Sequence, residues 1–390
     1  MCITISFSLF IIIVLETCQA FSGSSTTKSD NYPSSLVAFK DWCTSNGIIT
    51  PLDLQVRSEN GGDYRYMVYS SDQSIAGRRP EKLSGPILRI PLDACIVSDT
   101  LEGLTKELEK EKSLGEDSYF APYINVLPAL DSPSLQSMPR FWSEEKLEKV
   151  SEFDGGQIYQ RVELVKSTCK EYNLDPWAYA CVNSRANFLD GKGYAMTPIL
   201  DMMNHDGSSK TTASIIENEL FLSIEKDFSF GEEVFISYGT FSNVETLCDY
   251  GFVDLENNNC MTECVDVRMI RKAPVKVTID GNANGRIDLG SLAILRSYLA
   301  SPEEVEALLC NDDTISMNTV YTRPISDTNE EDVYSFVASF IDEAIYDGKA
   351  GIQWAKENHE DMIEHYLNCR VEVLTKGLNF IKGKFPNLLY

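Results

Sequence analysis

The sequence predicts an α+β fold, with a strand-rich front that is interrupted by helices and a helical back. Three observations predict it: short β-rich runs in the first 90 residues and again at 220–237, helical periodicity across much of 100–180, and helical patterns after about residue 255. A chain of 390 residues is long enough for two domains, and its 43% apolar content supports a sizeable core.

The front is expected to begin with a short helix, 36–44, and to continue through three strands at 52–57, 64–69 and 86–91. Runs rich in Gly, Asn, Ser and Pro separate the three strands, as turns do. A charged helix is expected over 99–112.

The middle of the chain is expected to return from helix to strand. Residues 157–174 are apolar at helical spacing, so that a helical insert is predicted at about 100–180. Two short strands follow at 220–224 and 233–237, and Gly231 is expected to turn the chain between them.

The back is expected to be helical. Residues 289–299 are apolar at helical spacing, and residues 301–304 (Ser-Pro-Glu-Glu) form a capping box with proline in the first turn. A second box is predicted at 328–331, followed by one apolar helical face over 333–345. A further long helix is expected over 352–381.

The net charge of −25 and the pI of about 4.5 argue against nucleic acid as a partner, because phosphate binding needs a basic face. The acidity fits a soluble protein that meets a basic protein surface, although solubility alone also explains it. The apolar stretch 7–15 is nine residues long, too short for a stable membrane anchor.

The first residues have the composition of targeting segments. Residues 1–20 are expected to be a signal peptide, with Cys18-Gln19-Ala20 as the cleavage site, and 21–34 resemble a transit peptide because they are rich in hydroxyl groups. This order resembles the bipartite presequences of algae with secondary plastids, so plastid delivery is expected. Secretion is the alternative.

The cysteines do not form a disulfide framework or a zinc site. Eleven are present, nine remain after residue 20, and none lies in a CxxC motif. Cys260 and Cys264 are the one close pair, with no further ligand at zinc spacing. Reduced core thiols and no bound metal are therefore expected.

Four motifs lie in order within seventy residues. They are Ser184-Arg185, Asn204-His205, the run 231–239 (Gly-Glu-Glu-Val-Phe-Ile-Ser-Tyr-Gly), and 249–252 (Asp-Tyr-Gly-Phe). Each is weak or moderate alone, since a lone Arg on a helix is usually a solvated group and most tyrosines at strand ends are packing residues. Together they resemble the C-terminal half of a SET domain, in the branch of the Rubisco large-subunit lysine methyltransferase.

The resemblance covers about residues 36–385. It implies a SET-type β-rich domain over 35–254, with a pseudoknot and the helical insert, followed by an all-α substrate-binding domain over 255–390. A pseudoknot is a topology that proteins otherwise avoid. The zinc-binding tail that follows some SET domains is absent.

The resemblance also implies the roles of the site residues. Tyr238 is expected to be the catalytic tyrosine that lines the path of the methyl group, and Tyr250 and Phe252 are expected to form the walls of the substrate lysine channel. Asp201 is expected to orient the loop that carries Asn204 and His205. The full set of expected cofactor-binding residues is Ser184, Arg185, Asp201, Asn204, His205, Tyr238 and Phe252.

The implied activity is S-adenosylmethionine-dependent N-methylation of a lysine on a non-histone protein. A histidine acceptor is the first alternative. The second is an inactive SET-like protein-binding module, because Tyr64 and Tyr66 stand where the family has a Gly-x-Gly turn near the cofactor. Plastid delivery would make a stromal enzyme such as Rubisco or aldolase the protein partner, by analogy, and a monomer is expected.

Overall fold

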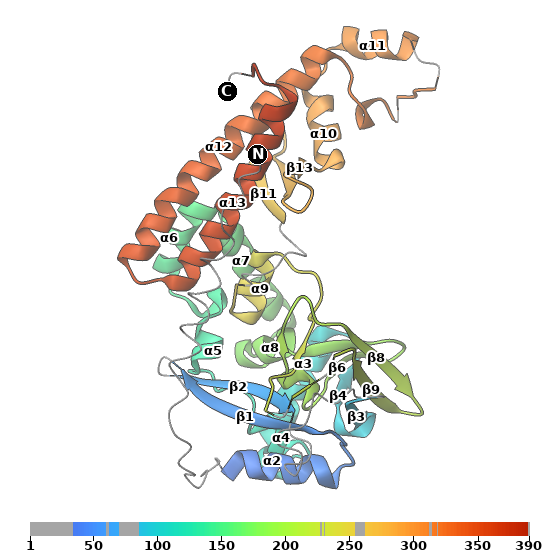
Figure 1. The fold of residues 1–390 in the computed structure, drawn as a ribbon, viewed down its shortest axis with the longest axis vertical. Coiled ribbons are helices and arrows are strands. Elements are labelled where there is room, and N and C mark those ends of the chain that lie inside the picture. Colours follow the sequence, from blue (N-terminus) through green and yellow to red (C-terminus); the bar gives the residue numbers. More distant parts are fainter. Residues whose placement is uncertain are drawn as a thin grey trace, which may run out of the picture.

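The computed structural model describes residues 34–59, 62–69, 86–226, 228–229, 231–253, 262–311, 314–317 and 319–388. The chain has two parts, a strand-rich front and an elongated back built around two long helices (Figure 1). The expected targeting segments, 1–20 and 21–34, lie outside the described residues except for Ser34. Within the described ranges, no helix is both long and apolar enough to cross a membrane.

The front contains several short sheets rather than one large sheet. Strand β9 shows why these runs form strands, since its alternate residues Leu220, Leu222 and Ile224 are buried. The sheets are β1–β2, β3–β9–β8 and β4–β6–β5, with a small parallel pair formed by β7 and β10. The front opens with α2 (Ser34–Ser45), and its strands are β1 (Leu52–Glu59), β2 (Gly62–Tyr69), β3 (Leu88–Pro91), β4 (Ile96–Ser98), β5 (Ala186–Leu189), β6 (Gly193–Met196), β7 (Asn204–His205), β8 (Thr211–Ile216), β9 (Glu219–Ile224) and β10 (Phe235–Ile236).

The helical insert lies close to its predicted position. Its first long helix begins where the Thr100 side chain accepts a hydrogen bond from the Gly103 N–H, and its last begins where Asp175 caps the Ala178 N–H. The first and last of these helices pack against each other, and the first also packs against β4. The insert helices are α3 (Leu101–Leu114), α4 (Ala121–Ile124), α5 (Pro133–Gln136), α6 (Glu144–Asp154), α7 (Gln157–Tyr172) and α8 (Pro176–Asn183).

The back contains the predicted helices and, in addition, a small sheet that corrects the expected all-α domain. Alternate residues of its first two strands are buried, with Val265 and Val267 on one and Val275, Val277 and Ile279 on the other. This period of two was present in the sequence, but the helical patterns around it hid it. The elements are β11 (Thr262–Val267), β12 (Val275–Asp280), β13 (Arg286–Ile287), α10 (Leu289–Leu299), α11 (Pro302–Asn311), α12 (Asp327–Glu357) and α13 (Asp361–Lys384).

The two predicted capping boxes of the back had different outcomes. The first is confirmed: Ser301 N–H donates to Glu304 Oε2 over 2.9 Å, and Glu304 N–H donates to Ser301 Oγ over 3.2 Å. The second is wrong, because α12 begins two residues earlier than predicted. Ser326 caps it by accepting from the Asn329 N–H over 2.9 Å.

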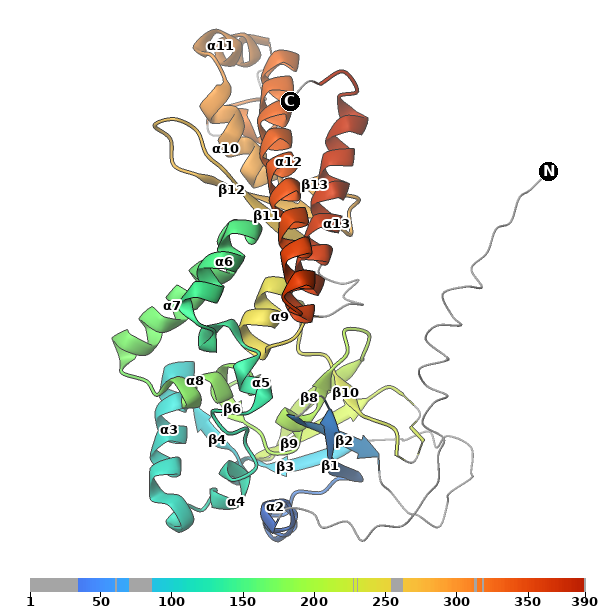
Figure 2. The same cartoon turned by 90° about the vertical axis from the view of Figure 1, so that its left-hand side faces the viewer.

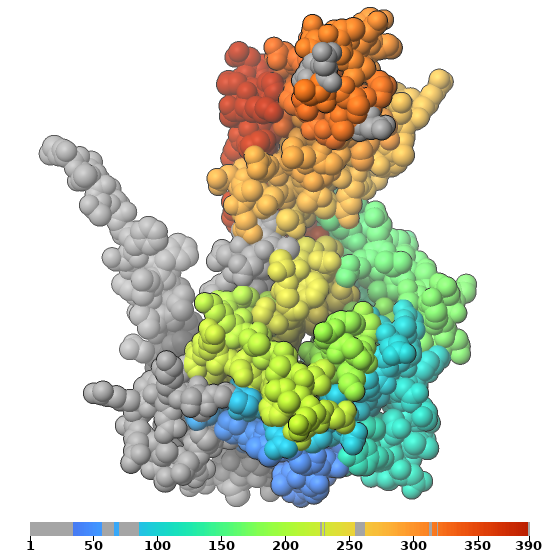
Figure 3. All heavy atoms as spheres, turned by 90° about the vertical axis from the view of Figure 1, so that its right-hand side faces the viewer, coloured from blue at the N-terminus to red at the C-terminus, as the bar shows by residue number. Residues whose placement is uncertain are grey.

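A buried apolar joint connects the front to the back. It joins α6, α7 and α9 (Asn243–Tyr250) to α12 and α13, through residues such as Val150, Leu247 and Leu367. Figure 2 shows α6 beside the lower half of α12, and Figure 3 shows the yellow segment of α9 between the two parts. A Cβ on Gly351 of α12 would lie 2.6 Å from Phe153, so glycine allows this close approach. The joint therefore fixes α9 from both sides.

Candidate active site

The loop that carries Asn204 and His205 lies beside the segment that leads to Tyr238. Strands β7 and β10 pair in parallel, with Asn204 opposite Phe235. Asn204 Nδ2 donates to Glu233 Oε1 over 2.8 Å, and Tyr238 N–H donates to His205 Nδ1 over 3.0 Å. Two segments about thirty residues apart in sequence are thus joined by backbone and side-chain bonds, as the predicted pseudoknot requires.

Tyr238 is held at both ends. Its hydroxyl donates to the carbonyl oxygen of Met203 over 2.7 Å, while its N–H is bound to His205. Because Nδ1 of His205 accepts this bond, that nitrogen carries no proton. The phenol therefore has a fixed direction, with its oxygen beside a backbone carbonyl.

Aromatic rings surround Tyr238. Its ring centroid lies 5.1 Å from that of His205, 5.0 Å from Tyr250 and 6.4 Å from Phe252. Phe241 lies 5.6 Å from Tyr250. These separations are typical of aromatic pairs in contact. Four of the residues predicted for the site, His205, Tyr238, Tyr250 and Phe252, thus form one aromatic group.

A glycine brings Phe252 back to this group. Helix α9 ends at Tyr250, and Gly251 follows in the left-handed region with φ of 81°. A Cβ at this position would lie 2.3 Å from Ser137 Oγ and 3.2 Å from the Ser134 carbonyl of the insert. Both the backbone angle and the close approach require glycine here.

Asp201 lies under the loop, with its carboxyl group enclosed by the protein. Its Oδ2 accepts a hydrogen bond from the Tyr123 hydroxyl, whereas its Oδ1 is buried with no hydrogen-bond partner among the described residues. Burial raises the pKa of this carboxyl to about 7, although the Tyr123 bond and the charge of Arg185 oppose the rise. Ionisation of Asp201 therefore costs more free energy here than in water.

The backbone just before Asp201 is strained. Ile199 has φ of 73° and ψ of −49°, close to the γ-turn geometry that β-branched residues rarely adopt. Such backbone outliers persist only where surrounding contacts hold them. The contacts around Ile199 therefore fix the start of the loop that carries Asn204 and His205.

Ser184 and Arg185 lie at the end of α8 and not in the aromatic group. Arg185 Nη1 donates to Ser184 Oγ over 2.7 Å, and Ser184 Oγ donates to the Ala180 carbonyl over 2.8 Å. Because the charge of Arg185 lowers the pKa of Asp201, these two predicted residues are near each other. The eight predicted residues therefore fall into two neighbouring sets.

Strand β2, which carries the altered glycine turn, borders the segment that leads to Tyr238. Val68 bridges to Glu233, and Val234 N–H donates to the Met67 carbonyl over 2.8 Å. Tyr66 is half-buried and lies opposite Gln55, while the side chain of Tyr64 lies outside the described residues. Strand β2 thus lies where the resemblance places the wall of the cofactor site.

Two contributors to the site were missed by sequence reasoning. Tyr123 lies within the predicted insert and Glu233 within a predicted strand, and they hold Asp201 and Asn204. Both contacts join residues far apart in sequence, so no local signal identified them.

The donor set fits S-adenosylmethionine, which carries a carboxylate, an ammonium, a sulfonium and an adenine. Arg185 supplies a cation for a carboxylate, Asn204 an amide for polar edges, and the rings of His205 and Phe252 flat surfaces for an adenine. In the described part of the chain, no group of three or more His, Cys, Asp or Glu side chains is placed to hold a metal ion.

Comparisons with known proteins agree with this geometry. No protein-family model matches the chain. The N-lysine methyltransferase setd6 of Xenopus tropicalis is 27% identical over 188 residues, which cover 39% of this chain and 40% of that protein. The human actin-histidine N-methyltransferase is 23% identical over 313 residues, which cover 67% of this chain and 50% of the relative. The chain thus matches half or less of the length of these relatives.

Solved structures match nearly the whole chain. Rubisco LSMT bound to sinefungin and monomethyllysine has a TM-score of 0.68 at 20% identity, over 92% of this chain and 93% of that one. The SET domain of LSMT bound to lysine and AdoHcy has a TM-score of 0.69 at 20% identity, over 91% and 93%. At this identity the likeness shows the fold.

The fold is therefore that of the SET-domain structures, and it joins the motifs that predicted it. The likeness to the Rubisco LSMT structure extends over both the strand-rich front and the mostly helical back of this chain.

Proposed function

We propose that this chain is an S-adenosylmethionine-dependent protein N-methyltransferase with lysine as its acceptor. The observation that carries the proposal is the fixation of Tyr238, whose hydroxyl is bound to the Met203 carbonyl and whose N–H is bound to His205. Relatives named as lysine and histidine methyltransferases, and structures of LSMT with AdoHcy and lysine, support it.

Positioning, rather than acid–base chemistry, carries methyl transfer. When bound, S-adenosylmethionine supplies a methyl group activated by a sulfonium. The residues of this chain hold the reactants in line: Tyr238 and the Met203 carbonyl present oxygen atoms, and Tyr250 and Phe252 exclude water from the acceptor amine. The acceptor amine must reach them without its proton.

Calorimetric titration of the protein with S-adenosylmethionine tests the proposal first. We expect saturable binding in the micromolar range, about −8 kcal/mol, followed by transfer of labelled methyl groups to a protein in stromal extract. No binding at millimolar cofactor would reject the enzyme. It would favour the alternative of a SET-like docking module, in which the side chain of Tyr66 on β2 blocks the cofactor site.

The acceptor type is read from the labelled product. Acid hydrolysis of the methylated protein should release methyl-lysine. Release of methyl-histidine would instead favour the histidine alternative, which the likeness to the actin-histidine enzyme supports.

We propose further that the protein acts in a plastid, as a monomer, on a stromal enzyme such as Rubisco or aldolase. The targeting composition of residues 1–34 supports plastid delivery, and the structural likeness to Rubisco LSMT supports the partner. Fluorescence from a fusion of residues 1–34 should locate to the plastid, whereas fluorescence in the medium would favour secretion.

A further inference from the structure

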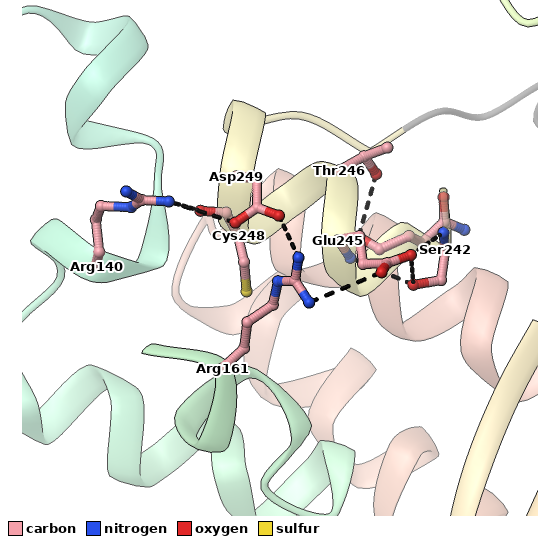
Figure 4. A network of polar contacts seen from close by, with 8 residues as sticks. Arg140, Arg161, Ser242, Glu245, Thr246, Cys248 and Asp249 are labelled. Carbon is pink, nitrogen blue, oxygen red and sulfur yellow. Dashed lines mark hydrogen bonds and ion pairs between the residues drawn. The ribbon is translucent and has the colours of Figure 1, made fainter. Parts of the chain in front are cut away.

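Asp249, the first residue of the Asp-Tyr-Gly-Phe motif, lies between two arginines of the helical insert (Figure 4). Arg140 Nη2 lies 3.3 Å from Asp249 Oδ1, and Arg161 Nη2 donates to Asp249 Oδ2. Arg161 also reaches Glu245 one turn earlier on α9, with 3.8 Å between Nη1 and Oε1. We call Arg140, Arg161 and Asp249 the α9 clamp.

The α9 clamp is largely buried, so each of its charged side chains relies on its partners, rather than on water, to compensate its charge. The side chain of Arg140 is 4% exposed and that of Asp249 11%, whereas Arg161 is 33% exposed. Burial lowers the pKa of Arg140. Arg140 Nε and Nη1 have no hydrogen-bond partner among the described residues, so Asp249 is its main compensation. Removing one partner of such a pair leaves a buried charge uncompensated.

The α9 clamp acts on the last turn of α9. Arg140 also donates to the Cys248 carbonyl over 3.3 Å, so the insert holds both a side chain and a backbone group of this turn. The next residue is Tyr250, followed by the bend at Gly251 that returns Phe252 to Tyr238. Any shift of this turn therefore moves the two rings next to Tyr238.

We infer that the α9 clamp is a positioning device, through which the insert sets the acceptor side of the site by holding Tyr250 and Phe252. The inference rests on the proposed function. The loop with Asn204 and His205 is held separately, through Glu233 and the pairing of β7 with β10. Loosening the last turn of α9 should therefore affect the acceptor side through both Tyr250 and Phe252, and the cofactor side only through Phe252, whose ring lies 5.9 Å from that of His205.

The test compares two affinities in Asp249→Asn. This change keeps the shape of the side chain but turns an NH₂ group toward the arginines and removes the charge. We expect the Kd of free ε-N-methyl-lysine, titrated into protein saturated with S-adenosylhomocysteine, to rise about tenfold or more. The Kd of S-adenosylmethionine should rise by a smaller factor, because Phe252 is the one expected cofactor-binding residue that the α9 clamp holds.

Glu330→Gln is the matched control, because it removes a carboxylate from a buried ion pair that joins α10 to α12 in the back, far from the site in sequence. It should lower stability but change neither affinity. If Asp249→Asn does not fold, Arg161→Gln gives the same readout, since Arg161 is a third exposed and Arg140 remains in place.

The outcomes separate the two proposals. Wild-type protein that fails to bind S-adenosylmethionine overturns the proposed function. If wild-type protein binds S-adenosylmethionine but not methyl-lysine, the inference that the α9 clamp positions the site for a lysine acceptor is overturned. Variants that weaken both affinities equally, or neither, show that the α9 clamp only stabilises the fold.

Discussion

Asp201 and Glu330 are both buried carboxyl groups, one under the loop that carries Asn204 and His205 and one among the helices of the back, and their partners differ in charge. Glu330 faces Arg296 through both oxygens, 3.0 Å from its Nη2, with Lys384 at 3.7 Å. Asp201 accepts one bond from the neutral Tyr123 hydroxyl, and burial raises its pKa to about 7. Two cations face the Glu330 carboxylate, whereas burial beside a single neutral donor raises the pKa of Asp201 and favours its protonated form.

The difference contrasts an ion pair that holds helices of the back together with a carboxyl group that lies beside the predicted site residues. A carboxylate that faces two cations joins α10, α12 and α13 to one another. The raised pKa of Asp201 places its change of charge near neutral pH, beside the loop that carries Asn204 and His205. Four sets of variants test this contrast.

The largest effect is expected from Glu330→Gln. It leaves Arg296 buried and without its carboxylate, which costs about 3–5 kcal/mol of unfolding free energy. Denaturant unfolding measures this loss, and the folded variant should bind S-adenosylmethionine as tightly as wild type. A weaker cofactor affinity would break the comparison, because the ion pair would then serve the site as well.

Tyr238→Phe should affect the reaction and not the fold. Loss of the hydroxyl beside the Met203 carbonyl should lower kcat about 10²- to 10³-fold, because the oxygen acts in the transition state. Calorimetry should find the cofactor Kd almost unchanged. An equal loss in turnover and in cofactor affinity would contradict the catalytic role.

Asp201→Asn should remove one pH dependence of stability. The folded pKa of about 7 lies above the ordinary 3.8, so the native state binds more protons between these values. The stability due to this group is therefore complete below the ordinary pKa and is lost as the pH rises through about 7. A pKa that differs by one between the folded and unfolded chains corresponds to about 1.4 kcal/mol of unfolding free energy.

Unfolding free energies of wild type and Asp201→Asn, measured from pH 4 to pH 8, check this expectation. The difference between the two should change from pH 4 to about pH 7 and level off from there to pH 8. A difference independent of pH would mean that Asp201 is charged throughout, and its contrast with Glu330 would disappear.

The smallest effect is expected from two matched helix caps, Ser242→Ala on α9 and Ser326→Ala on α12. Each removes a side-chain bond to the first turn and should cost about 1 kcal/mol. Only Ser242→Ala should also change the Kd for methyl-lysine, since α9 carries Tyr250. Equal effects on that Kd would show that the two parts are coupled more tightly than we propose.

Local patterns predicted the front strands, the insert and the long helices, because these depend on neighbours in sequence. The local patterns gave wrong predictions where the sequence supports two alternatives about equally well. Ser326 and Thr328 both offer a hydroxyl near the start of α12, and the extended backbone at Ser326, with φ of −148°, decides between them. The strands β11 and β12 were hidden for a similar reason, since the surrounding residues favour helix.

The motifs identified which residues to examine, but not the contacts that hold them. Asn204, His205 and Tyr238 were predicted from their order in the chain, and the structure joins them directly. The bond from Tyr123 to Asp201, and the arginines around Asp249, connect residues 78 or more positions apart. Periodicity and capping rules relate residues only a few positions apart, so they cannot predict such pairs.

The strained turn at Ile199 has a consequence for laboratory evolution of this protein. A γ-turn that holds a β-branched residue stores about 1–3 kcal/mol, which glycine would release. Ile199→Gly would nevertheless lower the unfolding free energy, because Ile199 is buried in the core and loss of its side chain costs about 2–5 kcal/mol. The same change would loosen the loop with Asn204 and His205, so selection for heat resistance and selection for turnover would both retain a large apolar residue at this position.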